Sequence, residues 1–240
     1  MSYFSSQGAL TPYPFTESLD TVFRFQADRF PHKPAIIFGT QRITYFELDQ
    51  QASAWAKLLQ DHQLLPEEPV ALLLEPGIDQ IAVQLGILRA GGSCVPLDPA
   101  QPDARLNDML DSLETRLLVT NAQWQVRLNT DYILLTDNVP TNTNFKPVAT
   151  TIHHRTHFLH TSGTTGRPKA VEVIALNILR LVFNREFSPL SENEIWAHIS
   201  NPTFDASLYE IYGALLNGAS LVVVPKQTLI DPYALRDVIR

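Results

Sequence analysis

The fold is decided by residues 159–171, which run Leu159-His160-Thr161-Ser162-Gly163-Thr164-Thr165-Gly166-Arg167-Pro168-Lys169-Ala170-Val171. Apolar residues flank a segment rich in hydroxyl groups and glycine, so the pattern predicts a strand, a flexible loop and a second strand. Glycines let consecutive backbone N–H groups converge on an anion, Ser and Thr hydroxyls add donors, and Lys169 supplies a positive charge. The stretch therefore indicates a phosphate-binding loop.

Two other interpretations fit this stretch less well. A Walker A loop, G-x-x-x-x-G-K-[ST], fails at two positions when it is counted from Gly163. Pro168 replaces the second glycine, and Ala170 replaces the Ser or Thr that binds magnesium. An ordinary polar surface loop is the second possibility, but such a connector does not need this density of donors between two apolar strands.

The segment 161–169 also resembles the nucleotide-phosphate loop of the adenylate-forming enzymes. That superfamily includes acyl-CoA synthetases, luciferases and the adenylation domains of non-ribosomal peptide synthetases. Two positions, Ala170 and Ala175, depart from the Gly and His that are usual there. The resemblance implies that the loop and Lys169, the expected catalytic residue, hold the ATP phosphates as charge develops on the leaving pyrophosphate. The implied ATP contacts are Thr161, Ser162, Gly163, Thr164, Thr165, Gly166 and Lys169.

Composition narrows the class of protein. The chain has 240 residues, of which 45% are hydrophobic, so it can form a sizeable core as one large domain or two lobes. No apolar run reaches the ~20 residues that span a bilayer. A net charge of -7 without any basic cluster argues against a nucleic-acid partner. The start of the chain lacks the features of a signal peptide. The single cysteine, Cys94, excludes an intrachain disulfide and a Cys-based zinc site, and fits a reducing cytoplasm.

Hydrophobic periodicity predicts strands that alternate with helices. Apolar runs predict strands at 34–38, 42–44, 69–74, 94–96, 116–120, 132–135, 158–161, 170–174, 194–199 and 221–225. Apolar residues three and four apart predict helices at 19–30, 45–59, 78–90, 102–113, 176–187, 206–216 and from 231. Thr44 and Glu47 have the spacing of a capping box. The order predicts an α/β fold with parallel-sheet βαβ units, residues 1–17 an extended leader and 137–151 an exposed connector.

Four histidines, His153, His154, His157 and His160, form the only histidine cluster. Three of them at intervals of three suggest a metal site. In a strand, however, that spacing places successive imidazoles on opposite faces, and no Cys or nearby carboxylate completes a coordination shell. We therefore predict no metal site, and histidines at the surface or at a strand edge.

A second informative stretch is Asn201-Pro202-Thr203-Phe204-Asp205-Ala206-Ser207-Leu208-Tyr209-Glu210-Ile211. Asp205 precedes a helical pattern, so the residues alone favour a helix N-cap worth about 1 kcal/mol. Phe-Asp-Ala-Ser followed by an aromatic residue, Glu and Ile is also similar to the signature of amino-acid-activating adenylation domains. That resemblance implies a substrate site at Phe204 and Asp205, with Asp205 paired to the substrate's α-ammonium.

The resemblance covers residues 18–240 and corresponds to the N-terminal portion of an adenylation domain, truncated before its later subdomain. It implies an enzyme that joins an amino acid to ATP and passes the aminoacyl group to a carrier-protein thiol. The magnesium ligand is then expected outside this chain, and a complementing C-terminal chain is a possible partner. By itself the chain is not expected to catalyse the reaction. The alternatives are a non-catalytic interaction module and an acyl- or aryl-acid ligase.

Overall fold

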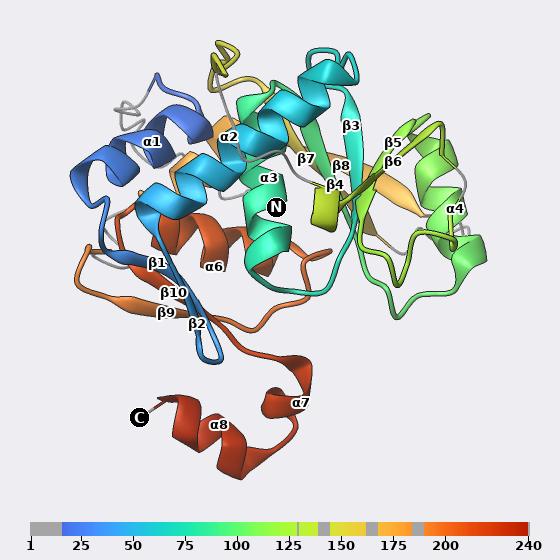
Figure 1. The fold of residues 1–240 in the computed structure, drawn as a ribbon. Helices are drawn as coiled ribbons and strands as arrows, with labels where there is room; N and C mark the ends of the chain where they lie inside the picture. Colours follow the sequence, from blue (N-terminus) through green and yellow to red (C-terminus); the bar gives the residue numbers. More distant parts are fainter. Residues whose placement is uncertain (1–15, 129, 139–144, 162–167, 184–189, 240) are drawn as a thin grey trace, which may run out of the picture.

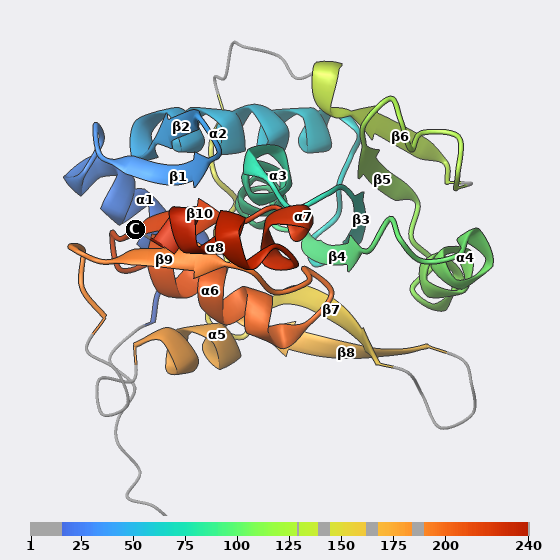
Figure 2. The same cartoon turned by 90° about the horizontal axis from the view of Figure 1, so that it is seen from below.

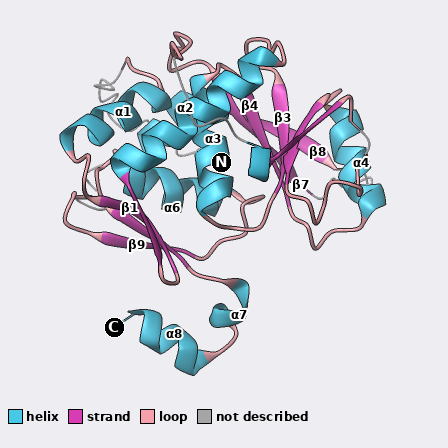
Figure 3. Ribbon diagram, viewed as in Figure 1, coloured by secondary structure: helices cyan, strands magenta, loops and turns pink. Residues whose placement is uncertain are grey.

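The computed structural model describes residues 16–128, 130–138, 145–161, 168–183 and 190–239. These residues form two β-sheets with helices between and around them, which is the predicted α/β class (Figures 1 and 3). Residues 1–15 of the predicted leader, and 139–144 of the predicted connector, lie outside the described residues. No described helix has the length and apolar character needed to cross a membrane.

The larger sheet has six strands in the order β6-β5-β3-β4-β7-β8. Neighbouring strands are parallel except β7 and β8, which are antiparallel. Alternate residues of β3 face opposite sides, so Val70 joins the main core and Ala71 joins a second core under α4. The sheet's central strands β3, β4 and β5 are thus buried on both faces, whereas its outer strands β6 and β8 are partly exposed. Its strands are β3 (Pro69–Leu73), β4 (Ser93–Leu97), β5 (Leu117–Thr120), β6 (Tyr132–Leu135), β7 (Arg155–Thr161) and β8 (Lys169–Ile174).

The smaller sheet has four strands in the order β2-β1-β10-β9. It joins the two ends of the described chain, because β1 pairs in parallel with β10. Ser220 Oγ donates a 2.7 Å hydrogen bond to the carbonyl of Pro34, which is 186 residues away in sequence. The strands are β1 (Pro34–Phe38), β2 (Gln41–Thr44), β9 (Ile195–His198) and β10 (Ser220–Val223).

The helices pack against both sheets. The predicted capping box opens α2, where Glu47 N donates to Thr44 Oγ1 at 3.2 Å and Thr44 N donates to Glu47 Oε2 at 2.8 Å. Gly86 lets α3 approach α2 closely, since a Cβ there would lie 2.4 Å from the Cβ of Trp55. The helices are α1 (Leu19–Arg29), α2 (Tyr45–Asp61), α3 (Ile78–Arg89), α4 (Asp103–Ser112), the 3-10 turn η1 (Thr136–Asn138), α5 (Ala175–Val182), α6 (Asp205–Leu215), α7 (Lys226–Leu229) and α8 (Pro232–Ile239).

Helices α1, α2 and α3 are joined by a buried arginine. The Arg89 side chain is only 1% exposed and pairs with Asp20 of α1 at 2.7 Å and with Asp49 of α2 at 2.6 Å. Its guanidinium also donates to Ser53 Oγ at 2.6 Å. The charge at the end of α3 is therefore fully compensated inside the protein.

Two predicted helices differ from the observed ones. The helix predicted at 176–187 ends at Val182, and residues 184–187 lie outside the described residues. The short helix α7 was not predicted, because four residues are too few to show a period.

Candidate functional site

The predicted strand, loop and strand around the phosphate-loop sequence are the antiparallel pair β7 and β8. Thr161 ends β7 and Lys169 begins β8, and the two residues face each other in the ladder. The predicted contacts Ser162, Gly163, Thr164, Thr165 and Gly166 lie between them, outside the described residues. Both Thr161 and Lys169 are exposed, and among the described residues Lys169 has no ion pair. The Lys169 ammonium is thus available to an anion at the mouth of the loop.

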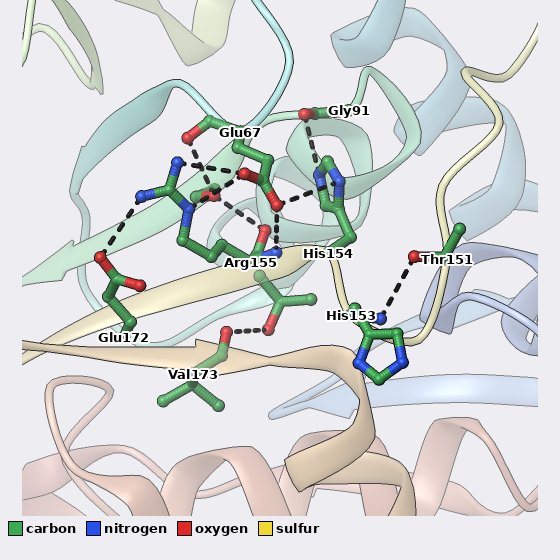
Figure 4. A network of polar contacts seen from close by, with 10 residues as sticks. Glu67, Gly91, Thr151, His153, His154, Arg155, Glu172 and Val173 are labelled. Atoms are coloured by element: carbon green, nitrogen blue, oxygen red, sulfur yellow. Dashed lines mark hydrogen bonds and ion pairs between the residues drawn. The ribbon is translucent and has the colours of Figure 1, made fainter.

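The opposite end of β7 is anchored by a polar network (Figure 4). The carboxylate of Glu67 accepts hydrogen bonds from the backbone N–H of Arg155 at 2.9 Å and from Arg155 Nε at 3.1 Å. The bond from the Arg155 backbone is the main cause that lowers the pKa of Glu67. Across the pair of strands, Arg155 also contacts Glu172 at 3.3 Å, and His154 Nε2 lies 2.9 Å from the carbonyl of Gly91. The pair β7–β8 is therefore fixed in the sheet at the end that holds Arg155.

Asp205 is not the N-cap of α6, so that prediction is wrong. The extended backbone runs one residue further, to Phe204 with φ -110° and ψ 151°, and Asp205 is the first helical residue. Both side chains are exposed, Phe204 by 62%. No described residue bonds to the Asp205 carboxylate. A carboxylate in the first turn of a helix is stabilised by the positive end of the helix dipole.

Helix α6, which begins at Asp205, and strand β7, which ends at Thr161, are in direct contact. Tyr212 of α6 lies with its hydroxyl 3.2 Å from His157 Nε2 of β7. Figure 2 shows α6 alongside β7, with its N-terminal end toward the β7–β8 pair. Asp205 lies at that end of the helix. Lys169 lies at the loop end of the strand pair.

A cleft of about 490 Å³ lies between the two sheets. It is lined by residues that directly follow β3, β4, β9 and β10, where parallel strands end and where ligands of open α/β sheets bind. Asn201 Nδ2 crosses it to donate to Asp98 Oδ2 at 2.6 Å. The lining includes neither Lys169 nor Asp205, but it borders the segment that leads into α6.

A larger cleft, of about 780 Å³, opens beside β2 and the start of α3. It contains none of the site residues predicted from the sequence. Burial, and then the neighbouring Asp137, raise the pKa of Asp79 on its wall.

The histidine prediction is wrong for His157, which is fully buried because β7 lies between β4 and β8 and not at the sheet edge. Burial lowers the pKa of His157 to about 3. Burial, and then the nearby Arg105, lower the pKa of His160 to about 4. In the described part of the chain, no group of three or more His, Cys, Asp or Glu side chains could hold a metal ion.

His157 gives a testable pH dependence of stability. Its folded-state pKa of about 3 lies below the ordinary value of 6.5, so the unfolded chain binds the proton first. The stability is complete above pH 6.5 and is lost as the pH falls from 6.5 toward 3, by up to about 1.4 kcal/mol per pH unit from this residue. We expect the free energy of unfolding in urea to fall less steeply between pH 6.5 and 4.5 in His157→Gln than in the parent protein. The exposed His153, changed to Gln, is the matched control; an equally steep decline in His157→Gln would contradict the prediction.

The two sheets, the strand pair around a loop rich in Gly, Ser and Thr, and the helix that begins at Asp205 together define the N-terminal α/β portion of an adenylate-forming enzyme. The chain belongs to the AMP-binding enzyme family, whose model matches residues 23–240.

Relatives from a fungus support this assignment. The nonribosomal peptide synthetase asaC of Aspergillus flavus is 38% identical over all of this chain, which spans 24% of asaC. The aldehyde reductase lnaA of the same organism is 39% identical over 84% of the chain, which corresponds to 20% of lnaA. The chain thus spans about a quarter or less of the length of these two relatives.

Solved structures share the fold. The N-terminal subdomain of NpsA from Klebsiella oxytoca superposes with a TM-score of 0.85 at 28% identity, over 93% of this chain and 59% of that one, and NpsA has also been solved with 3-hydroxybenzoyl-AMSN. The nonribosomal peptide synthetase FmoA3 in its AMPPNP-bound form superposes with a TM-score of 0.86 at 28% identity. The match covers 96% of this chain and 25% of the FmoA3 chain. An artificial fusion of NpsA and ThdA, an adenylation–PCP di-domain, superposes with a TM-score of 0.87 at 28% identity. The match covers 95% of this chain and 46% of the fusion.

Proposed function

We propose that this chain is the N-terminal part of an amino-acid-activating adenylation enzyme. The reaction joins the amino acid's carboxylate to the α-phosphate of ATP, releases pyrophosphate, and leaves an aminoacyl-AMP for transfer to a carrier-protein thiol. The observation that carries the proposal is the exposed carboxylate of Asp205 at the start of α6, which bonds to no described residue. An α-ammonium that leaves water needs a compensating carboxylate, whereas a fatty-acid pocket does not.

The described residues around the loop fit ATP. Lys169 presents an exposed ammonium beside a loop whose glycines and hydroxyls suit a phosphate group. In the proposed reaction, Lys169 neutralises charge on the departing pyrophosphate. Mg²⁺ is proposed to enter with ATP and to take its protein ligand from outside the described residues.

The proposed partners are an amino acid and a carrier protein, supported by the adenylation–PCP fusion among the similar structures. Because the chain matches only part of its relatives, the proposed activity needs further sequence, either in the same polypeptide or in a complementing C-terminal chain. A cytoplasmic location is proposed from the single cysteine, Cys94, which is buried and unpaired.

The phosphate role of Lys169 is tested by Lys169→Ala in the catalytically competent protein that contains residues 1–240. We expect amino-acid-dependent exchange of pyrophosphate into ATP to fall roughly ten- to a hundredfold, less than for a buried donor because solvent screens the exposed ammonium. The free energy of unfolding should change by less than about 0.5 kcal/mol, as for a surface substitution. Lys57→Ala is the control, because Lys57 is a partly exposed lysine on α2 whose ion pair, with Asp61, lies within the same helix. A large loss of stability with unchanged exchange per folded molecule would make Lys169 structural.

An aryl-acid ligase is the second candidate, because the related NpsA has been solved with 3-hydroxybenzoyl-AMSN. This activity also uses ATP and the phosphate loop, but its substrate carries no α-ammonium. The two candidates therefore differ in what they require of Asp205.

A further inference from the structure

Glu210 of α6 is bonded to the segment that precedes its own helix. Its Oε2 accepts hydrogen bonds from His198 Nδ1 at 2.7 Å and from the backbone N–H groups of Ile199 at 3.1 Å and Ser200 at 3.0 Å. Its Oε1 accepts from Ser200 Oγ at 2.6 Å. Partial burial acts to raise the pKa of Glu210, but the bonds from His198 and Ser200 outweigh it and lower the pKa. An ionised carboxylate only accepts, so His198 Nδ1 carries the proton.

This segment, residues 199–204, forms neither helix nor strand and joins β9 to α6. Asn201 fixes its middle, because its side-chain oxygen accepts from Thr203 N at 3.0 Å while its Nδ2 donates to Asp98. Outside any ladder, the N–H groups of Ile199 and Ser200 need a partner, and the Glu210 carboxylate supplies it. The segment is thus bonded to the larger sheet through Asn201 and to α6 through Glu210.

We propose that Glu210 is a positioning residue for the substrate site, and that its bonds to residues 198–200 set the place of Phe204 and Asp205. The side chains of Phe204 and Asp205 are exposed, so their place is fixed by the backbone on either side of them, which the bonds of the preceding segment and the packing of α6 hold. The inference rests on the proposed function and adds a residue that holds Asp205, the proposed partner of the α-ammonium, in place. Glu210 itself touches neither substrate nor ATP in this role.

The test is Glu210→Gln in the catalytically competent protein. An amide has one acceptor oxygen and presents N–H groups to donors, so it cannot accept all four bonds. We expect hydrogen exchange of the Ile199 and Ser200 amides to rise at least about tenfold. The ratio of kcat/KM for the amino acid to that for its analogue without the α-amino group should fall at least about tenfold, while KM for ATP stays within about twofold. These changes follow if the segment loses its fixed place.

Glu67→Gln is the matched control, because Glu67 is also a carboxylate that accepts from a backbone N–H, but at the far end of β7 from the loop. Glu67→Gln should leave the hydrogen-exchange rates of the Ile199 and Ser200 amides, and the ratio of the two kcat/KM values, as in the parent. Unchanged amide exchange in Glu210→Gln, or increased exchange with parental selectivity, would overturn the inference. A parent protein without amino-acid-dependent activity would contradict the proposed function instead, whereas the amide exchange tests the bonds of Glu210 independently.

Discussion

Replacing Arg89 by Met is expected to destabilise the protein by about 3–5 kcal/mol, because two carboxylates that the guanidinium neutralises are left without it in the interior. The Asp20 side chain is 5% exposed and that of Asp49 is 23% exposed. In thermal unfolding, this loss corresponds to a fall in Tm of roughly 6–20 °C for a domain of this size. The effect should appear in the free energy of unfolding in urea at pH 7.

Arg24→Met is the matched control, since Arg24 pairs with the same Asp20 at 3.0 Å but its side chain is 40% exposed. Solvent screens that pair, so its loss should cost less than about 1 kcal/mol. A variant that combines Arg89→Met with Asp20→Asn and Asp49→Asn should recover part of the stability, because no uncompensated carboxylate remains. Equal losses for Arg24→Met and Arg89→Met would show that burial does not set the strength of these pairs.

Changing Asp205 to Asn is expected to abolish most of the selectivity for an amino acid. If Asp205 pairs with the α-ammonium as proposed, its loss leaves a desolvated ammonium without a partner, at a cost of about 3–5 kcal/mol, or roughly a hundredfold to several thousandfold in kcat/KM. The analogue that lacks the α-amino group should be relatively spared. Folding should be nearly unchanged, because the carboxylate is exposed and bonds to no described residue.

Asp103→Asn gives the control for this experiment, because Asp103 is likewise the first residue of its helix, α4, after an N-cap that makes no side-chain bond. Its substitution should leave both substrates' kinetics as in the parent. Equal activity of Asp205→Asn and the parent on the amino acid would exclude the ammonium contact. In that case the aryl-acid ligase would become the better proposal.

The sequence was informative wherever local pattern determines structure. Apolar runs such as 69–74 identify strands buried on both faces, and the spacing of Thr44 and Glu47 is enough to begin α2. The pair β7–β8 follows from two apolar stretches around a loop of Gly, Ser and Thr. In each case the decisive interactions lie within a few residues along the chain.

Interactions between distant residues were not predictable in this way. Neither strand sequence shows that β1 pairs in parallel with β10. The sequence of β7 likewise does not show that this strand lies inside the sheet, where His157 is buried. The sequence places the start of α6 at residue 206, whereas the helix begins at Asp205. The backbone before the helix is fixed by tertiary bonds of Asn201 and Glu210, which the local pattern does not show. Glu210 lies in the stretch 201–211, which the sequence pattern singles out. Its proposed role, however, depends on bonds to His198 and Ser200 that only the folded chain shows.

The pairing of β1 with β10 also sets the order of events during synthesis. A ribosome that adds about 5–20 residues per second needs roughly 10–40 s to make the 186 residues between the bonded Pro34 and Ser220. Until β10 is made, the edge of β1 that receives it lacks its strand partner in the smaller sheet, and an unpaired strand edge can pair with other strands. We therefore expect the risk of aggregation at this edge to persist until β10 emerges.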